Sequence, residues 1–354
     1  MKKVLFATTA LVAFAGAAAA EVTLTGNAEM GIIDSDADGF DIQFHTDIDV
    51  TFTMSGETDG GVAFGATIDL DESDTDRTIS GVPVNDDGSG GLSASDIEVG
   101  GSPAFDNTTQ GGETIFLSGS FGTVTMGDTD GALDWAMTEV AFNSGSINDD
   151  ETSHGGYNGN AGLDGVYDGQ ILRYDYTAGA FGFAASIELN DNDGDDGDLL
   201  DGLDGDAVLA LGVKYDLDLG GTVIGLGLGY QTTEVTEIGD LQGDHDIIGL
   251  SANTSFAGGL TVGINYSDFD RPDASGLSGD HFGIGVGYTS GPLSVSANYG
   301  IFDFDSGAEA DGLGLSAGYD LGGGAIVQAG YGYTDGDGAT DDLSTYSVGF
   351  RFNF

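Results

Sequence analysis

The sequence contains no cysteine, 4 prolines and only 7 lysine and arginine residues among 354. Without cysteine, the chain cannot form a disulfide framework, carry out thiol chemistry or bind zinc through thiolates. Seven cations against 60 acids cannot neutralise a phosphate backbone, so nucleic acid is excluded as a partner. The formal charge is −53, yet 40% of the residues are hydrophobic, which is too many for a disordered acidic tail. We therefore expect a folded body.

Beyond the N-terminus, the sequence also lacks any apolar run near the ~20 residues that a membrane-spanning helix requires. The N-terminal segment starts with Lys2 and Lys3, continues with apolar residues from Val4 to Ala15, and ends in small residues before Glu21. This order is typical of a secretory signal peptide, with a retained anchor as the alternative. We expect residues 1–20 to be removed on export and residues 21–354 to form the folded domain.

The apolar residues that are present follow a period of two. From Phe40 to Ser55, apolar side chains occupy one parity and polar side chains such as Asp47 and Asp49 occupy the other. Side chains of a strand point alternately to opposite faces, so this segment predicts a strand with one apolar and one polar face. The pattern recurs along the chain, and no segment shows a 3.6-residue apolar period. The sequence predicts an all-β protein.

Short glycine-rich turns alternate with long Asp-rich segments. Seven turns and eight long segments predict sixteen antiparallel strands of about 9–12 residues, long enough to cross a bilayer at a tilt. A soluble β-sandwich also alternates apolar and polar positions. Short turns at one end and tyrosines near strand ends favour a closed membrane barrel. Glycines at inward positions have no side chains to fill the barrel, which predicts a water-filled lumen. The long segments are 34–39, 71–112, 128–168, 190–206, 235–245, 267–281, 303–311 and 334–343, and the inward glycines are Gly225, Gly227, Gly229, Gly283, Gly285, Gly287, Gly312, Gly314 and Gly318.

Several motifs resemble the general diffusion porins of alphaproteobacterial outer membranes. They are Glu21 to Gly31, Phe52 to Gly56, Phe116 to Gly122 with Met126 to Asp128, Arg173 to Tyr176, and the terminal Phe350 to Phe354. The resemblance implies a sixteen-stranded antiparallel transmembrane β-barrel with long extracellular loops, short periplasmic turns and an inserted third loop. It also implies a homotrimer with one pore per subunit, surrounded by outer-membrane lipid and lipopolysaccharide, whose Phe354 is recognised by the barrel-assembly machinery. The segment 71–112 is longer than the resemblance leads us to expect.

By position, the third loop is the segment 128–168, which carries nine acids and no lysine or arginine. The resemblance implies that this loop narrows the pore and that its acids face a basic cluster on the opposite wall. In this sequence the basic cluster is nearly missing. Arg173 and Lys214 are the inward-facing candidates, and the alternative for Arg173 is a local pairing with Asp175. On the second strand, His45, Asp47 and Asp49 are expected to line the pore. The alternative for the loop is a solvated surface segment. Its acids are Asp128, Asp130, Asp134, Glu139, Asp149, Asp150, Glu151, Asp164 and Asp168.

Motifs for metal binding and catalysis are weak. Asp34, Asp36 and Asp38 fit the first half of an EF-hand loop, but position twelve is His45 instead of glutamate and no flanking helices are expected. We predict no resident cofactor, with a loop-bound Ca²⁺ as the single candidate. The four histidines show no arrangement with serine and acid that suggests a hydrolase, so we predict that the protein is not an enzyme.

These observations predict an outer-membrane porin for passive diffusion of small hydrophilic solutes and ions, with a preference for cations. One alternative is a substrate-selective channel of the same fold, and another is a non-conducting acidic barrel that binds Ca²⁺ at the cell surface. The high overall acidity has its own explanation, an adaptation to saline water in which exposed charges are screened. Only charges at the narrowest point therefore bear on selectivity.

Overall fold

The computed structural model describes residues 21–37, 42–71, 109–142, 145–147, 154–167, 169–190, 205–235, 242–272, 277–336 and 342–354. The expected signal peptide and most of the segment 71–112 lie outside these ranges. Five of the candidate site residues also lie outside them, namely Asp38, Asp149, Asp150, Glu151 and Asp168.

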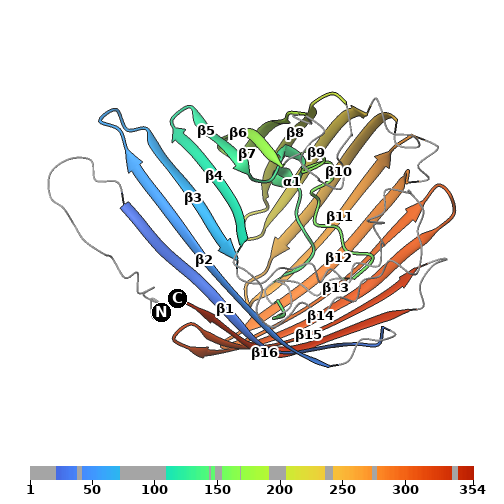
Figure 1. Cartoon of the computed structure of the whole chain (residues 1–354). Coiled ribbons are helices and arrows are strands. Elements are labelled where there is room, and N and C mark those ends of the chain that lie inside the picture. The colour runs from blue at the N-terminus through green and yellow to red at the C-terminus, as the bar shows by residue number, and fades with distance from the viewer. Residues whose placement is uncertain are drawn as a thin grey trace.

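Sixteen strands form one closed antiparallel barrel, in which each strand pairs with its neighbours in the chain and β1 pairs with β16 (Figure 1). The predicted all-β, sixteen-stranded barrel is confirmed. The strands are β1 (Glu21–Ser35), β2 (Gln43–Glu57), β3 (Ala63–Asp71), β4 (Thr109–Gly119), β5 (Gly122–Asp128), β6 (Gln170–Ala178), β7 (Phe181–Glu188), β8 (Val208–Asp218), β9 (Val223–Val235), β10 (Gly243–Ser255), β11 (Leu260–Asp270), β12 (Gly279–Ser290), β13 (Leu293–Phe304), β14 (Glu309–Gly322), β15 (Ala325–Gly336) and β16 (Leu343–Asn353).

One predicted long segment is wrong. The connection expected at 303–311 is a tight turn, because Asp303 and Glu309 are cross-strand partners within β13 and β14. The Phe304 N–H donates to the Ala308 carbonyl oxygen across this turn at 2.9 Å. Strand pairing satisfies the backbone more completely than a loop would, so acids that resemble loop residues in the sequence extend the strands instead.

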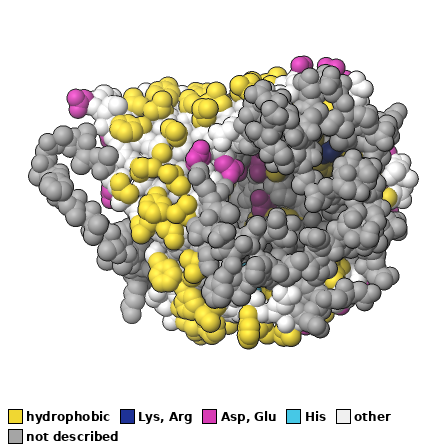
Figure 2. All heavy atoms as spheres, viewed as in Figure 1, with side chains coloured by type: hydrophobic (Ala, Val, Ile, Leu, Met, Phe, Trp, Pro, Cys, Tyr) yellow, Lys and Arg dark blue, Asp and Glu magenta, His cyan; other side chains and the backbone are white. Residues whose placement is uncertain are grey.

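The outer surface of the barrel is apolar. In β2, Phe44 is 87% exposed and Ile48 is 45% exposed, whereas Asp47 and Asp49 have the opposite parity and face the lumen. Figure 2 shows hydrophobic side chains gathered on the left-hand surface and acidic side chains beside the central hollow. This arrangement is inside-out relative to a soluble barrel and fits a hydrocarbon solvent around the wall. Within the described part of the chain, no helix is long and apolar enough to span a membrane.

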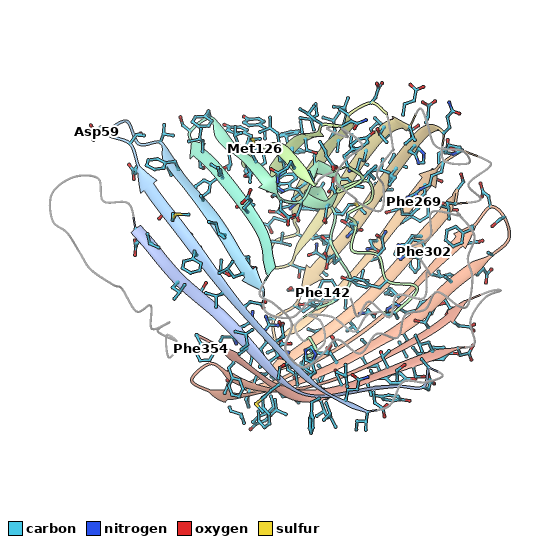
Figure 3. The ribbon with its side chains drawn as sticks, viewed as in Figure 1. Asp59, Met126, Phe142, Phe269, Phe302 and Phe354 are labelled. Atoms are coloured by element: carbon cyan, nitrogen blue, oxygen red, sulfur yellow. The ribbon has the colours of Figure 1, made fainter. Side chains whose placement is uncertain are left out.

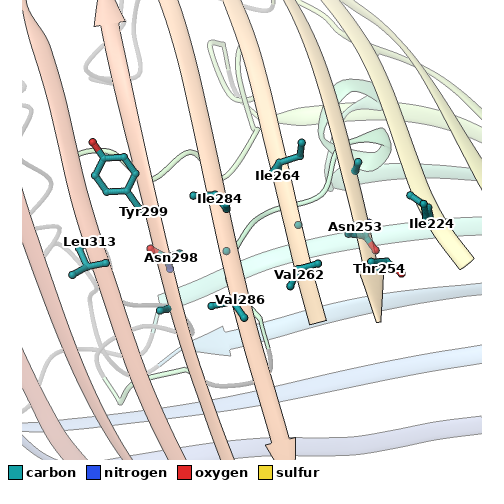
Figure 4. Close-up of a pocket in the computed structure, with 14 residues that line it drawn as sticks. Ile224, Asn253, Thr254, Val262, Ile264, Ile284, Val286, Asn298, Tyr299 and Leu313 are labelled. Atoms are coloured by element: carbon teal, nitrogen blue, oxygen red, sulfur yellow. The ribbon is translucent and has the colours of Figure 1, made fainter. Parts of the chain in front are cut away.

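The same outer wall carries a shallow apolar depression of about 530 Å³ across β9 to β14 (Figure 4). Ile264, Ile284, Val286 and Tyr299 line it, and each is between 37% and 46% exposed. Because these residues belong to the lipid-facing parity, the depression is part of the outer wall, and its lining is mainly apolar although Asn253, Thr254 and Asn298 also belong to it.

The buried apolar core lies inside the barrel, between the wall and the chain segment that follows β5. It consists of Leu133, Met137, Leu163, Tyr167, Val208, Val235 and Ile247. Four of these residues belong to the segment between β5 and β6 and three belong to the wall, so burial of apolar surface holds that segment inside the barrel.

Candidate functional site: a channel constriction

The described residues between β5 and β6 (129–142, 145–147, 154–167 and 169), called the inserted loop below, fold into the barrel, as predicted for the segment 128–168. The loop begins with the short helix α1 (Ala132–Ala136), which packs on β7, β8 and β9 (Figure 1). The Ala132 N–H donates to Ser186 Oγ of β7 at 2.8 Å, and the Thr138 N–H donates to Ser251 Oγ of β10 at 3.0 Å. Hydroxyl groups on the wall thus satisfy loop amides that would otherwise be buried without partners.

The more distal part of the loop reaches β11 through β16 and β1. Phe142 lies inside the barrel (Figure 3) and packs where Gly263 of β11 carries no side chain. The Gly155 N–H donates to Thr334 Oγ1 of β15 at 2.8 Å. Ile147 covers Gly31 of β1 and Gly349 of β16. The contacts that seat the loop therefore follow the inner face of β6 to β16 and β1, called the covered wall below.

The inward glycines have a different role from the one predicted. Instead of leaving the lumen unfilled, many of them form the surface on which the inserted loop lies. A Cβ atom at Gly285 would lie 1.7 Å from the Val140 carbonyl oxygen, and one at Gly227 would lie 2.1 Å from the Ala136 carbonyl oxygen. Real Cβ atoms do not tolerate such distances, so glycine at these positions permits the close approach of two backbones.

The returning part of the loop is anchored by one buried carboxylate. Glu188 of β7 is 1% exposed and accepts hydrogen bonds from the N–H groups of Gly165, Tyr167 and Gly169, each at 3.0 Å. Three donors on one carboxylate compensate for the burial of its charge. Sequence reasoning missed Glu188, because in so acidic a chain a single glutamate gives no distinct signal.

Gln231 of β9 is a second anchor, and it is fully buried. Its Oε1 accepts the Leu163 N–H at 2.7 Å, and its Nε2 donates to Asp164 Oδ1 at 2.6 Å. Asp164 in turn accepts the Gly131 N–H at 2.7 Å, so the outgoing and returning parts of the loop are joined. The sequence analysis missed this glutamine as well.

Four of the predicted loop acids are described and lie in the inserted loop. The pKa of Asp134 is raised to about 7 by burial first and then by the negative charges of Asp130, Glu139 and Asp164, against the opposing effect of Arg173. Burial likewise raises the pKa of Asp164 to about 6, despite its two hydrogen bonds. Glu139 is exposed and accepts the Tyr157 hydroxyl at 2.6 Å. The loop thus concentrates negative charge in one place.

Asp128, the fifth described acid of the predicted set, lies apart from this group. It is exposed and shares the outward parity of β5 with Met126, which is 54% exposed. The prediction that Asp128 faces the pore does not fit this parity, because the loop turns inward only after the strand ends.

Arg173 and Lys214 lie beneath the loop instead of across the passage from it. Arg173 Nη1 donates to the Asp130 carbonyl oxygen at 2.5 Å, and its Nε lies 3.5 Å from Asp175 Oδ1. The Lys214 Nζ lies 4.2 Å from the centroid of the Trp135 ring, a cation–π contact. The alternative predicted for Arg173, a local pairing with Asp175, is therefore present, and the same side chain also holds the start of the loop.

Among the residues that the structure describes, the anchoring contacts given above involve none of β2 to β5, and the inner face of these four strands is called the bare wall below. His45, Asp47 and Asp49 lie on its inward parity, as predicted. Asp69 of β3 joins them and accepts the Thr51 hydroxyl at 3.0 Å. Glu29 of β1 is the cross-strand partner of Asp47 and forms an ion pair with Arg351 at 3.3 Å. The sequence analysis missed Asp69, although its alternation with Ile68 and Leu70 gave the signal.

The proposed calcium residues lie at the end of β1. Asp34 Oδ1 accepts the Ser35 N–H at 3.0 Å, and Asp36 Oδ1 accepts the Ser344 N–H at 2.6 Å, which extends the pairing of β1 with β16. Among the described residues, no group of three or more histidines or acids is arranged to hold a metal ion. Asp38 is outside those residues, so the Ca²⁺ suggestion stays a prediction.

A closed barrel with an apolar outer surface, whose lumen contains one of its own loops, defines the class of β-barrel membrane channels. The comparisons make this more specific. The chain matches a Gram-negative porin family model over residues 7–339. It is 30% identical to the porin of Rhodobacter capsulatus, over 94% of this chain and 100% of that protein. The chain belongs to the Gram-negative porin family, and it is a diffusion channel of the outer membrane and not an enzyme.

Solved structures agree with this assignment. A porin refined at 1.8 Å resolution superimposes with a TM-score of 0.61 at 26% identity, covering 94% of this chain and 100% of that chain. A triple mutant of the Rhodopseudomonas blastica porin gives a TM-score of 0.57 at 21% identity with the same coverage. The latter likeness supports the fold alone.

Proposed function

We propose that this porin passes small hydrophilic solutes and ions by passive diffusion and favours cations. The observation that carries the proposal is that both sides of the passage are acidic. Asp130, Asp134, Glu139 and Asp164 belong to the inserted loop, and Asp47, Asp49 and Asp69 belong to the bare wall. Charge lining a narrow, low-dielectric passage raises the local concentration of the opposite ion.

The placement of the basic residues supports the same proposal. Arg173 and Lys214 are both engaged at the start of the loop with Asp130, Asp175 and Trp135. A transverse field between an acidic loop and a basic wall is therefore not the arrangement we infer. We infer instead that the acidic loop and the acidic bare wall face each other across the passage.

The test is the reversal potential of single channels in a planar bilayer under a KCl gradient. Wild-type channels should show a cation-selective potential. The variant D130N/D134N/E139Q/D164N should lose most of that preference. A matched control, Glu234→Gln with Asp244→Asn, Asp268→Asn and Asp280→Asn, removes four exposed acids from outside the passage and should retain it. Equal losses in both variants would reject the assignment of selectivity to the inserted loop.

Several further properties belong to this proposal and rest on the resemblance described above. We infer export through a signal peptide at residues 1–20, assembly as a homotrimer, recognition of Phe354 by the barrel-assembly machinery, and contact with lipopolysaccharide. A substrate-selective channel of the same fold remains the second candidate, because the acidic passage would also suit divalent or organic cations. The reversal potential with CaCl₂ in place of KCl separates the two.

A further inference from the structure

Two histidines from different parts of the chain meet where the distal part of the inserted loop lies on the covered wall. His154 belongs to the loop and is 6% exposed, and His281 belongs to β12 and is fully buried. Between them lies Gly156, whose backbone bonds to both rings. The backbone there is pressed against the wall, since a Cβ atom at Gly156 would lie 2.0 Å from the Gly300 carbonyl oxygen of β13.

The hydrogen bonds fix the protonation state of His154. The Gly156 N–H donates to His154 Nδ1 at 3.2 Å, so Nδ1 must carry a lone pair. The proton of the neutral ring is then on Nε2, which donates to Asn298 Oδ1 of β13 at 2.5 Å. A proton added to Nδ1 would face the Gly156 N–H, donor against donor, and this bond would be lost.

The same reasoning applies to His281. Its Nε2 lies 3.0 Å from the Gly156 carbonyl oxygen and can bond to it only as a donor. The lone pair is therefore on Nδ1, which is buried and has no hydrogen-bond partner among the described residues. A proton added there would be a buried donor without an acceptor, next to the Phe302 ring at 4.5 Å.

We propose that His154 and His281 are positioning residues of the channel constriction, which hold the distal part of the inserted loop on the wall only while both rings are neutral. Acid that protonates the pair breaks the bond from the Gly156 N–H to His154, leaves the new N–H of His281 buried without an acceptor, and places two positive charges side by side. The distal loop then leaves the wall and enters the passage. This inference rests on the proposed role of the inserted loop as the constriction.

The surroundings favour the neutral pair near pH 7. Burial lowers the pKa of His154, although the nearby charge of Asp311 on β14 and the bond to Asn298 act in the opposite direction. Among the described residues, Asp311 faces His154, Tyr157 packs edge-on against its ring at 6.0 Å, and the two histidines act on each other. The loop should therefore stay seated at neutral pH and leave the wall only in acid, below the ordinary pKa of a histidine.

The experiment uses a nitroxide label at Ala141→Cys, which is specific because the chain has no cysteine of its own. Label mobility is measured from pH 7.5 to pH 4 in the folded barrel, together with single-channel conductance. We expect the label to become mobile in the acidic part of this range, with frequent closures of the channel, and both changes to reverse at pH 7.5. H154Q/H281Q, whose side chains do not titrate, should lose the mobility step. H245Q, which alters a buried histidine outside the pair, should keep it.

Each single variant supplies a further test. A label that is already mobile at pH 7.5 in H154Q or H281Q also supports the positioning role. A label that stays immobile down to pH 4 in wild-type protein would overturn the proposal, and so would a mobility step unchanged in H154Q/H281Q. Because label mobility reports the seat of the loop and not ion preference, a channel without cation selectivity would reject the proposed function and leave this inference standing.

Discussion

The covered wall and the bare wall belong to one barrel, yet their inward-facing residues differ in kind. Under the inserted loop, the wall presents glycine together with buried amides, hydroxyls and carboxylates such as Gln231, Ser251 and Glu188. Beside the passage, the wall presents charge and threonine, as in Asp47, Asp49 and Thr51. Backbone that lies against backbone requires missing side chains and matched hydrogen bonds, whereas a water-filled surface tolerates charge.

This difference shows that the packing of the inserted loop divides the inner surface of the barrel into a part that the loop covers and a part that faces the passage. The covered wall behaves like a protein core, with fully buried polar groups that are paired with the inserted loop. The bare wall behaves like a protein surface. Removing a hydrogen bond or adding a side chain where the loop meets the covered wall should therefore disturb the seating of the loop. Changing a charge beside the passage should alter ion preference alone.

The largest effect is expected from Glu188→Gln. The amide group cannot accept at its nitrogen, so at least one of the three N–H groups of the returning loop loses its acceptor, at a cost of about 1–3 kcal/mol for each buried donor. The loop should loosen, with noisier and larger conductance steps. Emission from Trp135, the only tryptophan, should shift to the red. E234Q removes the same charge at an exposed position and should leave both readouts unchanged.

A somewhat smaller effect is expected from Gly285→Ala. Its Cβ would lie 1.7 Å from the Val140 carbonyl oxygen, so the loop must shift, at the cost of about 1–3 kcal/mol that is typical of overpacking. Single-channel conductance should change while the barrel keeps its heat-stable mobility on gels. Gly336→Ala places the same methyl group where no atom lies within 4 Å and should conduct like wild type. Identical conductance in both variants would contradict the packing described here.

The smallest effect is expected from the titration of Asp134. Its pKa is raised to about 7, so this carboxylate is charged above pH 7 and neutral below it. Cation preference should therefore be higher at pH 8 than at pH 6, a step measured by the reversal potential under a KCl gradient. Asp134→Asn should reduce the step and lower the preference at pH 8, and the remaining step belongs to Asp164, whose pKa is raised to about 6. A step of undiminished size in this variant would assign the titration to another group.

The sequence predicted the barrel well because period-two alternation is a local signal that the pleat of a strand imposes on every residue. The parity of His45, Asp47 and Asp49 followed from the same signal. The inserted loop came from the resemblance alone, since nothing in the composition of residues 128–168 separates it from other Asp-rich segments.

The errors have physical reasons too. An inward-facing glycine leaves a space that either water or another backbone segment can fill, and the sequence does not distinguish the two. Gly227 and Gly285 were misinterpreted for this reason. The mid-height position of Arg173 and Lys214 could be predicted, but the side of the passage on which they lie depends on the path of the loop. Glu188 and Gln231 gained their roles only through partners at residues 163–169, a relation between distant segments that periodicity does not encode.

The most direct test of the account is cysteine accessibility in the conducting channel, since the passage is said to run between the inserted loop and the bare wall. Asp49→Cys places a thiol on β2, and Ser251→Cys places one on β10 beneath Thr138. A cationic methanethiosulfonate reagent should reduce the current through Asp49→Cys channels within minutes and leave Ser251→Cys channels unaffected. Equal modification rates at the two positions, or faster modification at Ser251→Cys, would contradict the account.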